Sequence, residues 1–198
     1  MMGKTHFTIG LATSLAIMQP ESFNECAVAL IAGAFGGVTP DNDLLDQTHS
    51  LSAQLYAMVT TFIVLLADFF FKWGICEHIM ANQTRAMIGL IGFLVFWIIG
   101  CYTDHRTFTH SLTAMFIYSL FFGFIYEPFT LCFMAAYLSH LLLDMLNKKK
   151  VPIFYPLDFG IALKLCYANG KFDVALMYIG GIVSAVLLIM GFASGITA

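Results

Sequence analysis

The chain has 198 residues, of which 60% are hydrophobic and only 11% are charged, and its mean hydropathy is +0.84. This balance excludes an ordinary soluble domain, in which roughly half of the residues are apolar and a quarter are charged. The net charge of −3 and the nine Lys and Arg residues argue against a nucleic-acid-binding surface, which needs clustered positive charge. Because no long polar block is available for a soluble domain, we expect residues 1–198 to form a single integral-membrane domain.

Seven apolar segments predict an all-α fold, a multi-pass transmembrane helical bundle. A helix needs about 20 residues to cross a hydrocarbon core of roughly 30 Å. The first two segments, 7–18 and 26–38, are short, and the glycines of the second predict a closely packed helical hairpin. Five further segments follow in chain order, at residues 51–71, 86–102, 111–126, 129–146 and 174–192.

Counting seven crossings assigns each polar loop to one side of the membrane. Seven of the nine basic residues then fall on the side of the N-terminus, and only Lys72 and Arg85 fall on the other side. Cytoplasmic loops of membrane proteins carry an excess of Lys and Arg. We therefore expect the N-terminus to be cytoplasmic.

Four polar clusters fall on this N-terminal side, because even numbers of crossings separate them. They lie at residues 5–6, 39–43, 105–111 and 139–144. Five of the six histidines are on the same side, and His78 alone is opposite. An ionisable side chain in or beside a membrane is costly, so these clusters are candidate functional sites.

Two of the clusters contain histidines whose spacing is informative. His140 and Asp144 are four residues apart, so they share one face of a helix. A plainer interpretation of this pair is a hydrogen bond that locks the helix to its neighbour. His105 and His110 converge most easily if His105 lies in a loop and His110 lies at the start of the next helix.

A third cluster ends the second apolar segment. Pro40 predicts the end of the helix just before two carboxylates, Asp41 and Asp43. Carboxylates in such a position can hold a divalent cation or activate water. They are equally common in a solvated loop, where Asp43 would cap a turn.

Together the clusters supply four imidazoles and three carboxylates: His6, His105, His110, His140, Asp41, Asp43 and Asp144. Nitrogen and oxygen ligands of this kind suit one or two divalent ions, zinc first, with manganese or iron as alternatives. The five cysteines stand singly and predict no thiolate site. A bound ion lowers the pKa of water, so the clusters indicate metal-assisted hydrolysis of an ester or phosphoester.

Further residues have predicted roles around the metal ligands. Arg106 would contact an anionic group of the substrate, and Asp43 would act as a ligand or as the general base. A site at the membrane edge favours a membrane lipid or another amphiphilic substrate. Candidates for hydrogen bonding around the ligands, or for ordinary capping, are Asn42, Asp104, Thr109, Ser111 and Asp158.

Two other functions use the same residues. A metal-ion or proton transporter would need polar side chains through the thickness of the membrane. Asp68 lies near the far end of its segment, and the other clusters gather at one side. This distribution favours a binding site at one face over a conduction route across the membrane. A non-catalytic membrane protein, in which the clusters only join helices, predicts that no metal binds.

The four clusters, in this order and spacing, resemble those of the YdjM-like membrane-bound metal-dependent hydrolases of the bacterial inner membrane. The resemblance runs from Thr5-His6 through the block at 105–111, which reads HRTFTHS, to Pro156. It implies a multi-pass hydrolase in the cytoplasmic membrane whose metal is held by the His and Asp positions named above. Enterobacterial members of the family belong to the SOS response.

Overall fold

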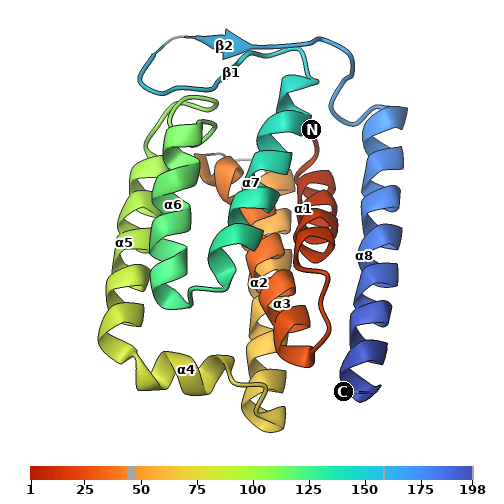
Figure 1. The fold of residues 1–198 in the computed structure, drawn as a ribbon. Helices are drawn as coiled ribbons and strands as arrows, with labels where there is room; N and C mark the ends of the chain where they lie inside the picture. The colour runs from red at the N-terminus through yellow and green to blue at the C-terminus, as the bar shows by residue number, and fades with distance from the viewer. Residues whose placement is uncertain (44–47, 158, 198) are drawn as a thin grey trace.

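The structure is a computed structural model, and it describes residues 1–43, 48–157 and 159–197, without the side chains of residues 48–50 and 197. These residues form eight α-helices, one 3-10 helix and one two-stranded antiparallel sheet (Figure 1). The helices are α1 (Gly3–Met18), α2 (Phe23–Val38), α3 (Thr48–Phe71), α4 (Ile75–Ala81), α5 (Gln83–Cys101), α6 (Leu112–Ile125), α7 (Phe129–Met145) and α8 (Lys171–Thr197). Each of the seven predicted segments is a helix. The structure is therefore a mostly helical bundle, as the composition predicts.

Exposed apolar side chains cover the outside of this bundle. Among the described residues, three helices are long and apolar enough to cross a membrane, over Leu51–Phe71, Gln83–Cys101 and Lys171–Ile196, and α6 and α7 are shorter apolar helices. Phe62, Ile98 and Ile189, for example, are 67%, 55% and 68% exposed. Apolar surface on this scale is covered by lipid in a membrane protein. The chain is thus built as a multi-pass helical membrane protein.

The short helix α4 is the helix that the sequence did not predict. The carboxylate of Asp68 accepts hydrogen bonds from the backbone amides of Ile75 (3.1 Å) and Cys76 (2.7 Å), the first residues of α4. Asp68 is only 1% exposed, so these bonds satisfy a buried charge. The acidic residue at the far end of α3 therefore has a structural partner.

Helix α2 lies at the centre of the bundle, between α1, α3 and α7. Its glycines let backbones approach: a Cβ atom on Gly37 would lie 2.5 Å from the carbonyl oxygen of His6, and one on Gly36 would lie 2.6 Å from that of Phe133. The Ser14 hydroxyl donates to the carbonyl of Ala29 (2.7 Å), which ties α1 to α2. This is the small-residue packing expected of the N-terminal hairpin, and it fixes α1 and α7 against the end of α2.

A segment between α7 and α8 covers one end of the bundle (Figure 1). We call residues 146–157 and 159–170 the cap; it contains the short strands β1 (Val151–Pro152) and β2 (Gly160–Ile161). The backbone amide of Leu112 donates to Ile153 (2.9 Å), and that of Leu165 donates to Leu146 (2.9 Å). The cap is therefore hydrogen-bonded to the start of α6 and continues from the end of α7.

Candidate metal centre

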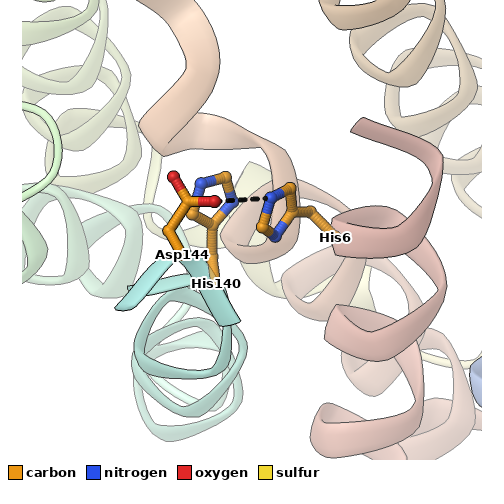
Figure 2. Close-up of side chains that lie close together, drawn as sticks. All are labelled: His6, His140 and Asp144. Carbon is orange, nitrogen blue, oxygen red and sulfur yellow. Dashed lines mark ion pairs between the residues drawn. The ribbon is translucent and has the colours of Figure 1, made fainter. Parts of the chain in front are cut away.

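Five of the seven predicted ligands lie in one buried cluster beneath the cap. His6 comes from α1, His140 and Asp144 come from α7, Asp41 comes from the 3-10 helix Thr39–Asp43 that follows α2, and His110 precedes α6. Their exposed fractions are 1%, 0%, 1%, 7% and 0% in that order. We call these five residues the inner cluster. Figure 2 shows His6, His140 and Asp144 pointing toward one another from α1 and α7.

Imidazole nitrogens and carboxylate oxygens face each other within the inner cluster. The Nε2 atom of His6 is 3.3 Å from Oδ1 of Asp144, the contact dashed in Figure 2. The Nε2 atom of His110 is 3.5 Å from Oδ1 of Asp41 and 3.5 Å from Oδ2 of Asp144. His140 Nε2 is 3.7 Å from Oδ1 of Asp41, and the His140 ring stacks on the His6 ring with centroids 3.6 Å apart.

These separations fit ligands around a metal ion better than hydrogen-bonded pairs. Hydrogen bonds from nitrogen to oxygen usually span about 2.7–3.2 Å. Ligand atoms about 2.0–2.1 Å from a tetrahedral ion lie about 3.3 Å from one another. The Nε2 atoms of His6, His110 and His140 are buried without a hydrogen-bond partner among the described residues, which is costly unless something binds them. The inner cluster therefore fits a divalent ion, as two overlapping groups of three ligands.

Contacts at the other ring nitrogen, Nδ1, set the direction of His140 and His110. Nδ1 of His140 lies 2.8 Å from the carbonyl oxygen of Gly37, so it carries the proton and leaves Nε2 free for a ligand bond. Nδ1 of His110 is 3.1 Å from the hydroxyl oxygen of Thr109 and 3.5 Å from Oδ2 of Asp43. Such outer contacts orient metal-binding imidazoles in known sites.

Asp43 and His105 form a second set beside the inner cluster. Oδ1 of Asp43 is 3.0 Å from Nδ1 of His105, and Oδ2 accepts hydrogen bonds from the Thr109 hydroxyl (2.8 Å) and the Arg106 amide (3.3 Å). Burial alone would raise the pKa of Asp43, but hydrogen bonds with His105 and His110 lower it to about 2. Asp43, His105 and His110 are a third group that could hold an ion. The contact of Asp43 with His105, however, has the length of an ordinary hydrogen bond.

Residues 1–197 match the family model described as YdjM inner membrane protein. The chain belongs to the YdjM inner membrane protein family. The family expected from the motifs is therefore confirmed, and so is the location in the inner membrane. No curated protein and no solved structure matches the chain.

Arg106 of this YdjM-family chain contacts the inner cluster and lines a polar cavity beside it. Its Nη2 atom is 2.8 Å from Oδ2 of Asp144, and its Nη1 donates to the carbonyl of Lys149 (2.8 Å). The Met1 amino group lies 2.7 Å from Oδ1 of the same aspartate. The cavity has a volume of about 420 Å³, and its lining includes Asp41, Arg106, Asp144, His105, Lys148 and Lys149. Its lining is therefore rich in basic side chains, and Asp41 and Asp144 connect it to the inner cluster.

The residues expected to support the ligands have several different partners in this YdjM-family chain. Thr109 binds Asp43, whereas Ser111 caps α6 by accepting a hydrogen bond from the amide of Ala114 (3.1 Å). The Asn42 amide donates to the carbonyl of Trp97 (2.9 Å) and so ties the 3-10 helix to α5. Asp104 is exposed in the loop before α6, and Asp158 lies outside the described residues.

Sequence reasoning missed four contributors to this region. Tyr137 donates a hydrogen bond to the carbonyl of Thr109 from one turn before His140 on α7, so its spacing was a usable signal. Lys148 and Lys149 reach the cavity from the basic run that follows α7. The carbonyl of Gly37 orients His140, and no side-chain pattern could have indicated this because the contact comes from the backbone.

Proposed function

We propose that the protein is a membrane-embedded, metal-dependent hydrolase that cleaves an ester or a phosphoester at the cytoplasmic face. The observation that carries this proposal is the inner cluster itself, in which three buried imidazole nitrogens lie beside two carboxylates that line a cavity rich in basic side chains. The excess of Lys and Arg on the N-terminal side supports a cytoplasmic N-terminus, and therefore a site at that face.

In this proposal the inner cluster holds one or two divalent ions, zinc first, with manganese or iron as alternatives. A bound ion would supply Lewis acidity and lower the pKa of a coordinated water toward 7. Asp41 and Asp144 would contribute negative charge toward balancing such an ion. The carbonyl of Gly37 and the side chain of Asp43 keep His140 and His110 in the orientation that ligand bonds require.

Proton transfer falls to the pair formed by Asp43 and His105. Nδ1 of His105 lies 3.0 Å from a buried carboxylate oxygen of Asp43. This is the geometry of a histidine base that is oriented by a carboxylate. The His105 side chain is 25% exposed and lines the cavity, so its second nitrogen is available to a reactant. Asp43 therefore acts as the positioning residue, and His105 accepts the proton from the attacking water.

The basic side chains that line the cavity favour a substrate with a negative charge. Arg106, Lys148 and Lys149 would meet the anionic oxygens of a phosphoester and stabilise the charge that develops during hydrolysis. A membrane lipid or another amphiphile fits this position best, because the site lies at the end of the bundle beneath the cap.

A transporter is less consistent with the interior of the bundle. Between α2, α3, α5 and α6 lies a cavity of about 260 Å³ whose lining is apolar except for Thr61. Asp68, on the far side, is occupied by the first amides of α4. The described residues thus offer no continuous series of ionisable groups from one side to the other, as conduction of an ion requires.

The test combines metal content with hydrolysis. The protein is purified in detergent, its bound metal is measured by plasma mass spectrometry, and cleavage of a chromogenic phosphodiester and of phospholipid in vesicles is followed. We expect the native chain to retain metal and to cleave one of these substrates, and His140→Ala to lose both properties. His78→Ala, on the opposite side, is the matched control. A native chain with no more metal than His140→Ala would refute the proposal.

A further inference from the structure

The cap presents large apolar side chains that do not pack on the bundle. Their exposed fractions run from 51% to 73%, and they are Phe154, Leu157, Phe159, Leu163, Leu165 and Tyr167. Three lie in the connection between β1 and β2, and three lie between β2 and α8. Exposed apolar patches of this extent, outside the membrane-spanning helices, mark an interaction surface.

Hydrogen bonds to the bundle hold this exposed surface in place. The hydroxyl of Thr113, on α6, donates to the carbonyl of Tyr155 (2.9 Å), and the amide of Leu163 donates to the carbonyl of Met145 (2.7 Å) on α7. Val151 and Cys166 of the same segment point inward and are 0% and 6% exposed. The cap is therefore an ordered part of the fold, with a buried inner side and an apolar outer side.

Positive charge is interleaved with the apolar side chains. The sequence of residues 146–170 holds four lysines and one acidic residue. Lys148, Lys149 and Lys150 form one exposed group, and Lys164 is exposed between Leu163 and Leu165. Apolar and aromatic residues mixed with lysines are the composition of segments that lie on anionic bilayer surfaces.

The position of the cap also fits a bilayer surface. It lies across the end of the bundle, and the connection between β1 and β2 extends over the ends of α5 and α6 (Figure 1). That end carries seven of the nine basic residues, the pattern of a cytoplasmic face. The outer side chains of the cap are therefore near the level at which a membrane-spanning bundle meets lipid headgroups.

We propose that the cap is a membrane-contact element that binds the anionic surface of the leaflet around it. Its apolar side chains lie among the headgroups and upper acyl chains, and its lysines pair with lipid phosphates. Lys148, Lys149 and Tyr167 also line the cavity above the inner cluster, so this cavity opens within the headgroup layer. It follows that the substrate is an anionic lipid, a conclusion that rests additionally on the proposed hydrolase function.

Tryptophan reporters test the contact without any assay of activity. Trp73 and Trp97 are replaced by Phe, and Leu157→Trp or Leu165→Trp is introduced as the only tryptophan. The full-length protein is reconstituted in phosphatidylcholine vesicles with and without phosphatidylglycerol, using lipids brominated high on the acyl chain. Ile189→Trp, on the exposed face of α8, provides the reference for a lipid-facing side chain.

We expect both cap reporters to be quenched at least half as strongly as Ile189→Trp, and more strongly when phosphatidylglycerol is present. Replacing Lys148, Lys149 and Lys150 together by Gln should remove the dependence on phosphatidylglycerol. The proposal is overturned if brominated lipid does not quench the fluorescence of either reporter and aqueous iodide quenches both as strongly as it quenches N-acetyltryptophanamide. Because the readout is position in the bilayer, failure of the hydrolase proposal would appear separately, as absence of bound metal.

Discussion

A single methyl group at Gly37 should weaken metal binding, although this residue offers no ligand side chain. In Gly37→Ala the new Cβ atom would lie 2.5 Å from the carbonyl oxygen of His6 and 3.2 Å from the Cα atom of Gly10. Ordinary contacts begin near 3.4 Å, so α1 must recede from α2 by roughly 1 Å. Both neighbouring atoms belong to the backbone, so no side chain can rotate away to make room.

This displacement is large compared with the tolerance of a metal site. Ligand distances are held to about 0.2 Å, whereas His6 would move together with α1. The carbonyl of Gly37 also orients His140, so one substitution disturbs two imidazoles. Lost orienting contacts typically reduce metal affinity by about 10–100-fold, and we expect at least that effect. Overpacking should also lower the free energy of unfolding by about 1–3 kcal/mol.

Gly181→Ala is the matched control, because a Cβ atom at that position of α8 meets nothing within 4 Å. Alanine favours a helix over glycine by roughly 0.5–1 kcal/mol, so this variant should be as stable as the native chain or slightly more stable. Metal affinity is measured in detergent by competition with a chromophoric chelator, and thermal unfolding is followed with and without metal. Native affinity in Gly37→Ala would show that close packing of α1 on α2 does not position the ligands.

Three further outcomes are expected. Asp144→Asn should lose most bound metal, as measured by plasma mass spectrometry, and native metal content would exclude this carboxylate as a ligand. Asp43→Asn should retain metal but with about 10–100-fold lower affinity in the chelator competition, because Asp43 orients His110. Complete loss of metal would instead indicate that Asp43 is a direct ligand. Asp68→Asn should lower the free energy of unfolding by about 1–3 kcal/mol, because one buried amide of α4 loses its acceptor, while metal content stays native.

The helices were largely predictable from sequence, because each long apolar run is itself a local signal. Segments as different as 26–38 and 174–192 needed only length and composition to be recognised. Helix α4 was missed because it has seven residues and depends on the carboxylate of Asp68, a partner outside the helix. Its start could not be read from its own residues.

The site was predictable only to the level of its four clusters. Counting crossings placed His6, Asp41, His110 and His140 at one side, but a count does not give the rotation of each helix about its axis. That rotation depends on contacts between distant segments, such as those of Gly36 and Gly37 with α7 and α1. Asp41 and Asp43 illustrate the limit: these two carboxylates have similar sequence signals and both lie near His110, but Asp41 also faces His140 whereas Asp43 also faces His105.

Composition and the order of the motifs by themselves determined that this is a multi-pass protein of the YdjM family, because hydrophobicity and motif spacing are properties of the chain. Tertiary structure alone decided that five candidate ligands meet beside a basic cavity and that Asp43 pairs with His105. The physical reason is that backbone contacts between α1, α2 and α7 position the imidazoles with the precision that metal coordination requires. No local sequence pattern encodes those contacts.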